Sequence, residues 1–173
     1  QVLACREALQ TAYANGDKKQ ICFAMSDLGF AFFRVRKYKD GLEMLDEAIE
    51  LANELDDRHV LARSLGVKVT AYQDADRLPD AFKIAQEILA LAEQHDDPAI
   101  KCDALASQAQ IMMASGDMDT ANKLIEEARS AADASDDKRR LMNVMGAMGH
   151  IALAGASSDK ALRHFEKALK LAR

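Results

Sequence analysis

The sequence contains no tryptophan, and aromatic residues make up only 5% of its 173 residues. It has two prolines and eight glycines, so the residues that interrupt helices are scarce. Alanine, leucine and methionine supply much of the 49% hydrophobic content, a balance that suits close-packed helices better than sheets. We therefore expect an all-α fold.

Cysteine chemistry and metal binding find little support in the sequence. The three cysteines, Cys5, Cys22 and Cys102, are odd in number and include no CxxC pair, which argues against a disulfide framework or a structural zinc site. The four histidines show no metal-ligand spacing. We expect buried thiols in a reducing compartment, and no metal or other cofactor.

The charge balance and the hydrophobic runs argue against two further classes of partner. A net charge of -5 argues against nucleic acid, because phosphate binding needs a basic stripe. The most apolar run, Leu141 to Ala156, contains Asn143 and His150 and is shorter than the roughly 20 residues of a membrane span. No signal peptide is visible. The sequence predicts a cytoplasmic protein, and its opening Gln1 suggests a fragment of a longer chain.

No catalytic motif is present. The sequence has no phosphate-binding glycine loop, no HExxH and no GxSxG. Paired carboxylates at 56–57, 96–97 and 136–137 could serve acid–base chemistry, but they recur at every unit boundary, which favours helix capping. We expect no enzymatic activity.

What the sequence does contain is a repeat. Aspartates recur at an interval of 40, and so do alanines: Asp17, Asp57, Asp97 and Asp137; Ala12, Ala52, Ala92, Ala132 and Ala172. A fixed period of this size indicates an array of helical units. With each Asp as an N-cap, first helices are expected near 18–35, 58–75, 98–115 and 138–155, and second helices near 39–55, 79–95, 119–135 and 159–172.

The apolar positions inside each unit carry a specific pattern. In the first full unit they include Leu28-Gly29, Phe32, Gly41 and Ala48, and the last unit matches at Met148-Gly149, Ala161, Phe165 and Ala168. This pattern resembles the tetratricopeptide repeat, although the interval exceeds the usual length of about 34 residues and suggests a longer-helix variant. Small residues at Gly41, Ala81, Ala121 and Ala161 are expected where paired helices approach most closely.

The resemblance implies a right-handed superhelical solenoid of antiparallel helix hairpins. The expected division is 1–16 as the second helix of a truncated repeat, followed by repeats at 17–56, 57–96, 97–136 and 137–173. Five positions depart from the family pattern. Lys68, Asn122 and Arg129 replace apolar residues, and Arg36 and Asp76 replace the turn glycine.

In such arrays the first helices line a concave groove that receives an extended peptide or a helix. The partner-binding residues expected from that resemblance are Phe23, Asp27, Phe30, Phe33, Arg34, Arg63, Thr70, Gln73, Gln110, Met113, Asn143 and His150. Phe23, Phe30 and Phe33 form either an exposed aromatic strip in this groove or part of the core against a missing helix. The sequence leaves both alternatives open.

The predicted function is a protein–protein interaction scaffold without catalysis. The alternative is a ligand- or peptide-sensing regulatory domain of a larger bacterial signalling or transcription-regulating protein. Helix 39–55 is strongly acidic and the final helix is basic, so a homo-oligomer through the end repeats is a further expectation.

Overall fold

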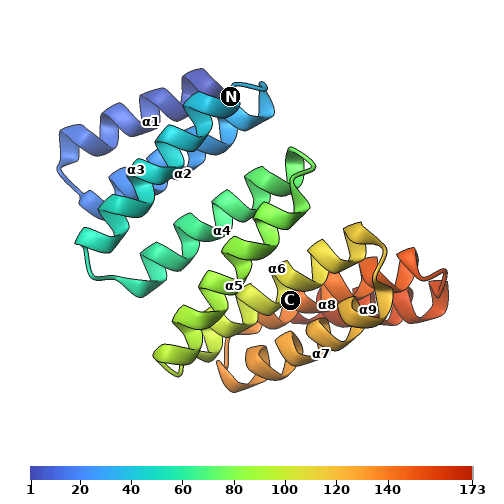
Figure 1. Ribbon diagram of the computed structural model, residues 1–173. Helices are drawn as coiled ribbons and strands as arrows, with labels where there is room; N and C mark the ends of the chain where they lie inside the picture. Colours follow the sequence, from blue (N-terminus) through green and yellow to red (C-terminus); the bar gives the residue numbers. More distant parts are fainter. Residues whose placement is uncertain (173) are drawn as a thin grey trace. The chain divides into compact units, whose positions relative to one another are not determined.

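The computed structural model describes residues 1–172, which form nine α-helices and no strand (Figure 1). They are α1 (Val2–Asn15), α2 (Lys18–Arg34), α3 (Tyr38–Glu54), α4 (Arg58–Asp74), α5 (Leu78–Gln94), α6 (Pro98–Ser115), α7 (Met118–Ala134), α8 (Lys138–Ala154) and α9 (Ser158–Leu171). The all-α prediction is confirmed. The four predicted first helices begin at the expected residues, and the second helices begin one residue earlier than expected.

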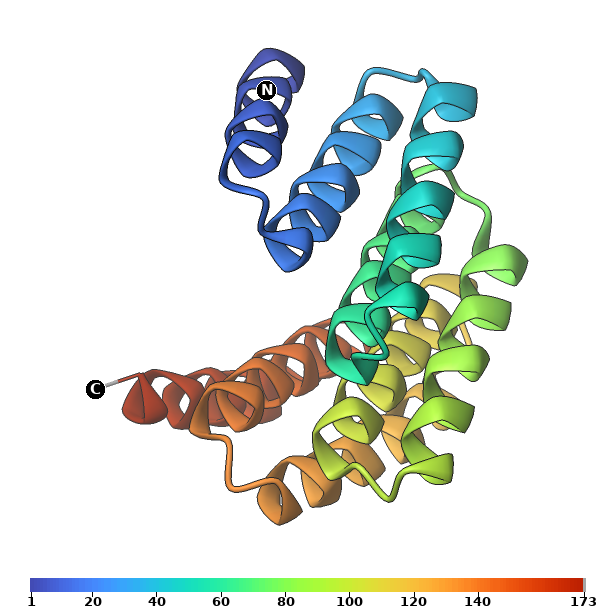
Figure 2. The same cartoon turned by 90° about the vertical axis from the view of Figure 1, so that its left-hand side faces the viewer.

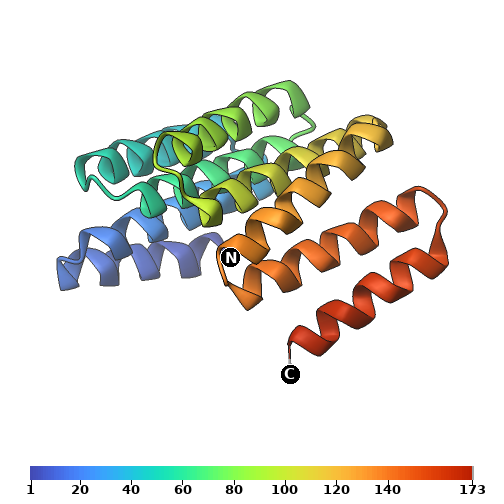
Figure 3. The same ribbon diagram turned by 90° about the horizontal axis from the view of Figure 1, so that it is seen from below.

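The chain divides into two compact units, Gln1–Ile84 and Ala85–Arg173, with the division inside α5. In the first unit α2 packs against α1 and α3, and α4 contacts both α2 and α3. Figure 2 shows α1, α2 and α3 as successive antiparallel helices. In the second unit α6 pairs with α7 and α8 with α9 (Figure 3), while α8 also contacts α6 and α7. Packing between near neighbours in sequence is the arrangement of a repeat array.

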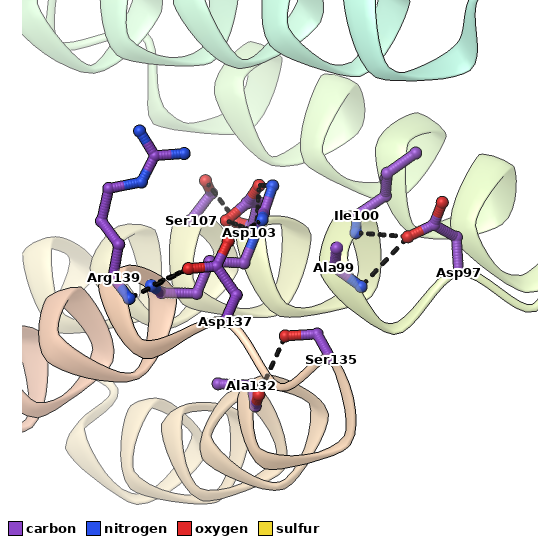
Figure 4. A network of polar contacts seen from close by, with 10 residues as sticks. Asp97, Ala99, Ile100, Asp103, Ser107, Ala132, Ser135, Asp137 and Arg139 are labelled. Atoms are coloured by element: carbon purple, nitrogen blue, oxygen red, sulfur yellow. Dashed lines mark hydrogen bonds and ion pairs between the residues drawn. The ribbon is translucent and has the colours of Figure 1, made fainter.

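Aspartate side chains fix where the first helices begin. Asp17, Asp57, Asp97 and Asp137 each accept hydrogen bonds from two backbone amides of the following turn, at 2.9–3.2 Å. Figure 4 shows this arrangement at Asp97 and Asp137. These bonds satisfy amides that have no partner inside the helix. The predicted caps are confirmed.

The other aspartate of each pair has a different role. Asp56, Asp96 and Asp136 adopt left-handed backbone conformations, with φ between 48° and 51°. Gly16 stands at the same point of the repeat with φ 67°. The second member of each pair is the N-cap, and the first member stands where the preceding helix ends. Each of these first members ends the preceding helix in a left-handed backbone conformation. Residues with a short polar side chain adopt this conformation more readily than most others.

A second left-handed position lies between the helices of each hairpin. Arg36, Asp76 and Ala156 have φ values of 61°, 58° and 56°, and Gly116 has 88°. Arg36 and Asp76 are the residues predicted to replace the turn glycine, and the backbone there keeps the glycine-like conformation. Lys68, which replaces an apolar residue of the family pattern, pairs its ammonium group with Asp46 at 2.5 Å, and its side chain is mostly buried.

Small residues line the close approaches inside each unit. Gly41, Ala81, Ala121 and Ala161 are buried, as predicted. A Cβ atom on Gly41 would lie 2.5 Å from the ring of Phe33. Ala12, Ala52, Ala92 and Ala132 are buried too, whereas Ala172 is exposed. The helices can approach closely because the residues at these points carry no side chain larger than a methyl group.

A polar cluster is buried between α2, α3 and α4. The Cys22 thiol donates to the carbonyl of Ala48 at 3.0 Å and lies 3.3 Å from the Ser64 hydroxyl. The Ser26 hydroxyl lies 3.2 Å from that same hydroxyl and bonds the carbonyl of Cys22 at 2.9 Å. Burial raises the pKa of Cys22. It also raises the pKa of Cys102 to about 12. Cys22 and Cys102 are buried as predicted, whereas Cys5 is only half-buried, so the prediction is wrong for that thiol.

Candidate partner-binding groove

The first unit contains a groove of about 580 Å³ bounded by α1, α2 and α4. Its α1 wall consists mainly of small side chains, and its α2–α4 wall is more polar. The lining residues are Gln1, Ala4, Cys5, Ala8 and Ala12 before and along α1, Gln20, Phe23, Ala24 and Asp27 on α2, and Arg63 on α4. Ala4, Ala8, Gln20, Asp27 and Arg63 are exposed, so the groove is open to solvent.

An arginine stacked on an aromatic ring marks the α2–α4 wall. The guanidinium carbon of Arg63 lies 4.0 Å from the centroid of the Phe23 ring. A cation over a ring face is attracted by the ring's negative potential, which holds the arginine side chain in place. Within residues 1–172, Arg63 has no ion pair and Asp27 has neither an ion pair nor a side-chain hydrogen bond. The groove thus presents a guanidinium and a carboxylate that can both receive a partner's charged groups.

The structure brings three predicted site residues together. Phe23, Asp27 and Arg63 line the same groove. On the same two helices but outside this lining, Phe30 and Gln73 are half-buried, while Arg34 and Thr70 are exposed. The Thr70 hydroxyl donates to the carbonyl of Gly66 at 3.1 Å.

The remaining predicted site residues belong to the second unit. Gln110, Asn143 and His150 are exposed on α6 and α8, and the His150 ring meets Phe165 edge-on at 5.2 Å. Met113 is half-buried and packs against the core of that unit. The structure therefore describes the predicted site as two separate sets of residues.

Phe33 is not exposed. It is 3% exposed and makes edge-to-face ring contacts with Tyr38 at 5.5 Å and Tyr72 at 6.2 Å. The prediction of an exposed aromatic strip is wrong for this residue, because Gly41 on the facing helix leaves room for the ring. The core alternative describes Phe33 correctly, although its neighbours are α3 and α4 and not a missing helix.

The α1 wall of the groove was not among the predicted site residues. Its members, Gln1, Ala4, Cys5, Ala8 and Ala12, stand 40 residues before Gly41, Met44, Leu45, Ala48 and Ala52. The repeat aligns α1 with α3, so the sequence does carry a signal for this wall. This wall corresponds to the second helices of the repeat, whereas the predicted site residues were all taken from first helices.

A charged cluster holds α6 and α8 together in the second unit. Arg140 donates to both carboxylate oxygens of Asp103 at 3.1–3.2 Å and also bonds Asp137 (Figure 4 shows the two aspartates). The carboxylate of Asp103 is thus engaged by Arg140. This cluster contributes to packing between first helices, in contrast to the unpaired Asp27 of the first unit.

Among residues 1–172, no group of three or more histidine, cysteine, aspartate and glutamate side chains is arranged to hold a metal ion. None of the described helices is long and apolar enough to cross a membrane.

A family model for the tetratricopeptide repeat matches residues 20–94. The matched segment contains α3, α4 and α5 and nearly all of α2. Residues 20–94 therefore carry tetratricopeptide repeats. Arrays of such repeats present extended surfaces for other proteins, so the chain has the architecture of a protein-interaction scaffold.

Solved structures with tetratricopeptide-like folds resemble nearly the whole chain. BtubC (BKLC) from P. vanneervenii is 17% identical with a TM-score of 0.77, and the match covers 99% of this chain and 72% of that one. A signal-transduction ATPase with numerous domains and a tetratricopeptide repeat sensor, from Pyrococcus horikoshii, is 18% identical with a TM-score of 0.67, over 94% of this chain and 25% of that one.

MamA is 18% identical with a TM-score of 0.55, over 97% of this chain and 86% of that one. At these identities the similarity concerns the fold alone. No curated protein matches the sequence.

Proposed function

We propose that this chain is a non-enzymatic interaction module that binds a peptide or helix of a partner protein, and that the groove of the first unit is the principal contact site. The observation that carries the proposal is the stacking of Arg63 on Phe23 at 4.0 Å, beside the unpaired Asp27 and opposite a wall of alanines. In this assignment the repeats are 17–56, 57–96, 97–136 and 137–173.

The groove combines an anchored charge with a flat apolar wall. The stacked guanidinium loses little side-chain freedom when it receives a carboxylate, because the ring already holds it. The alanine wall lets a partner backbone approach closely, and each large apolar side chain buried against it contributes about 1.5–3 kcal/mol. Phe30, Arg34, Thr70 and Gln73 extend the surface along α2 and α4. Gln110, Met113, Asn143 and His150 are the proposed contacts of the second unit.

The composition of the groove favours binding over catalysis. Among the residues that line it, no histidine or lysine is present to act as a general base for Cys5 or for a bound water. The open rim likewise favours a peptide over a small ligand, which usually binds in a more enclosed pocket. For this reason we prefer the scaffold to the alternative of a small-ligand sensor.

A peptide-display selection against the whole chain tests the proposal. We expect enrichment of sequences with an acidic residue, and at least about tenfold weaker binding of the selected peptides to Arg63→Glu, since the substitution reverses the anchored charge. The matched control is Lys83→Glu, the same charge reversal at an exposed position outside the groove. Failure to enrich any sequence, or equal loss of binding in both variants, would contradict the proposal.

A further inference from the structure

The second unit contains a pocket of about 340 Å³ between α7, the end of α8 and the start of α9. Helix α8 contributes apolar surface to its lining through Met148 and Ile151. Helices α7 and α9 contribute four polar side chains, which are Asn122, Glu126, Lys160 and His164. None of these residues lines the groove of the first unit, so the two sites are separate.

Two of the polar residues replace apolar residues of the repeat. The residues 40 and 80 positions earlier are apolar and half-buried: Phe82 and Leu42 for Asn122, and Leu124 and Ile84 for His164. Helix packing therefore favours apolar side chains at both positions. Because folding alone does not explain an asparagine and a histidine there, they indicate a functional site.

His164 gains no compensating contact inside the protein. Within residues 1–172 its Nδ1 atom is buried and has no hydrogen-bond partner, an arrangement that costs stability. Burial lowers the pKa of His164, as do the charges of Lys167 and Lys160, while Glu126 acts in the opposite direction. The imidazole is therefore neutral near pH 7, and one of its nitrogens can accept a hydrogen bond.

Two further acceptors and one cation lie in the same pocket. Glu126 accepts from Arg129 at 2.9 Å through one carboxylate oxygen, and its other oxygen has no hydrogen bond within the described residues. Asn122 donates its amide N–H to the carbonyl of Met118 at 2.7 Å, which leaves Oδ1 as an acceptor. Lys160 has no ion pair within residues 1–172. The pocket thus offers acceptors for a cationic donor and, beside them, a free ammonium group for an anion.

We infer that this pocket binds a free α-amino acid. The carboxylate of the ligand pairs with the ammonium group of Lys160. The ammonium group of the ligand has three N–H donors, which meet the acceptors of Glu126, Asn122 and His164. A modest rotation of the histidine ring about χ2, a soft torsion, turns Nδ1 towards the ligand. The apolar α8 residues of the lining favour a ligand with an apolar side chain. This function is additional to the peptide binding proposed for the first unit.

The pocket does not result from the ends of the sequence. All of its lining residues lie on α7, α8, α9 and the turn that precedes α9. Asn122 meets the α9 residues across the pocket, and its equivalent 40 residues later is the exposed Leu162. A further repeat after α9 would therefore pack on the side of α9 that carries Leu162, and His164 would still face α7.

Calorimetric titration of the whole chain with each proteinogenic amino acid tests the inference. We expect at least one amino acid with an apolar side chain to bind with a dissociation constant below about 1 mM. Its amide derivative lacks the carboxylate, and the corresponding α-hydroxy acid lacks the ammonium group. Each should bind at least about tenfold more weakly, because each loses one charged contact.

Two matched pairs of variants locate the contact. Lys160→Gln and Glu126→Gln should each weaken amino-acid binding at least about tenfold. Lys170→Gln on α9 and Glu127→Gln on α7 are the same neutralisations at exposed positions outside the lining, and they should leave binding unchanged. In nuclear magnetic resonance spectra, the imidazole signals of His164 should shift on binding, whereas those of the exposed His95 should not.

A double variant separates a binding role from a structural one. Asn122→Phe combined with His164→Leu introduces the residues found 40 positions earlier. We expect it to abolish amino-acid binding and to raise the melting temperature, since it removes a buried polar atom without a partner. A lower melting temperature would mean that the polar pair serves folding, and it would contradict the inference.

Three other outcomes would overturn the inference. One is that no amino acid binds with a dissociation constant below about 1 mM. Another is binding that persists in both Lys160→Gln and Glu126→Gln, because the ligand would then occupy a different place. The third is equally tight binding of the α-hydroxy acid, which would show a site for simple anions. Peptide binding in the groove of the first unit is measured independently and is not affected by any of these results.

Discussion

Gly149 on α8 lies directly against the ring of Phe165 on α9: a Cβ atom on the glycine would be 2.5 Å from Cε1 of the ring. On the same helix, a Cβ on Gly146 would meet no atom within 4 Å.

Replacing each of these two glycines by alanine should therefore have opposite effects on stability. Gly149→Ala should lower the free energy of unfolding by about 1–3 kcal/mol through overpacking. Gly146→Ala should raise it by up to about 1 kcal/mol through helix propensity. Urea unfolding followed by circular dichroism measures both, and equal effects of the same sign would refute the prediction.

The left-handed turn residues predict a stabilising substitution. Ala156 has φ 56°, a conformation that costs an L-residue roughly 1 kcal/mol and costs glycine little. Ala156→Gly should therefore raise the unfolding free energy by up to about 1 kcal/mol. Ala90→Gly, exposed in the interior of α5, is the control and should lower it by about 1 kcal/mol. A decrease in both variants would mean that the turn residue is not strained.

Phe33 is buried, whereas Phe23 and Phe30 of the same helix are half-buried. Phe33→Ala should lower the unfolding free energy by about 3–5 kcal/mol, because the ring is 3% exposed and packs on two tyrosines. Phe23→Ala should cost less stability, since Phe23 is half-buried, and should weaken the binding of display-selected peptides by removing the support of Arg63. Thermal melts combined with binding measurements distinguish the two residues.

The three thiols should react in a fixed order. Burial raises the pKa of Cys102 to about 12, so its thiolate is a very small fraction near pH 8. Burial also raises the pKa of Cys22. We expect a disulfide reagent to modify Cys5 first in the native chain, and Cys22 and Cys102 only on unfolding in urea. Fast native modification of Cys102 would contradict the packing of α6 described here.

His164 predicts a loss of stability in mild acid. Burial, followed by the charges of Lys167 and Lys160, lowers the pKa of His164 below its ordinary value of 6.5, although Glu126 acts in the opposite direction. Within the described residues its Nδ1 atom is buried and has no hydrogen-bond partner. The folded state thus disfavours the protonated imidazole, so stability is full above the ordinary pKa and falls as pH drops below it.

The melting temperature should therefore decrease between pH 7.5 and pH 5.5, and His164→Gln should reduce that decrease. His95→Gln, which removes an exposed imidazole elsewhere, is the control. A pH dependence that is identical in the wild type and in His164→Gln would show that another group is responsible.

The positions of the helices could be predicted because their start signals are local. An aspartate carboxylate reaches amides only two or three residues further along the chain, so Asp57 or Asp137 fixes a helix start without any tertiary information. Aspartate is favoured both as an N-cap and in left-handed turns, so a pair of aspartates does not by itself show which member caps the helix. Gly16, which stands 40 residues before Asp56, distinguishes the two roles.

The candidate site could be predicted only in part, because it depends on contacts between helices. Helical spacing placed Phe23 and Phe33 on one exposed face, but the cavity above Gly41 draws Phe33 into the core. The stacking of Arg63 on Phe23 joins residues of different helices and depends on how α4 packs beside α2. Sequence periodicity predicts which residues share one face of a helix, but it does not predict which neighbouring helix covers that face.

The buried cluster of Cys22, Ser26 and Ser64 has a consequence for the specificity of packing between α2 and α4. Burial of apolar surface is non-directional, so it distinguishes only weakly between neighbouring alignments of two helices. Hydroxyl and thiol groups are different, because each must meet a partner at a defined distance or remain unsatisfied away from water. A shift of one helical turn would separate the hydroxyls of Ser26 and Ser64. These three small polar side chains thus select one alignment from several that the apolar contacts alone would allow.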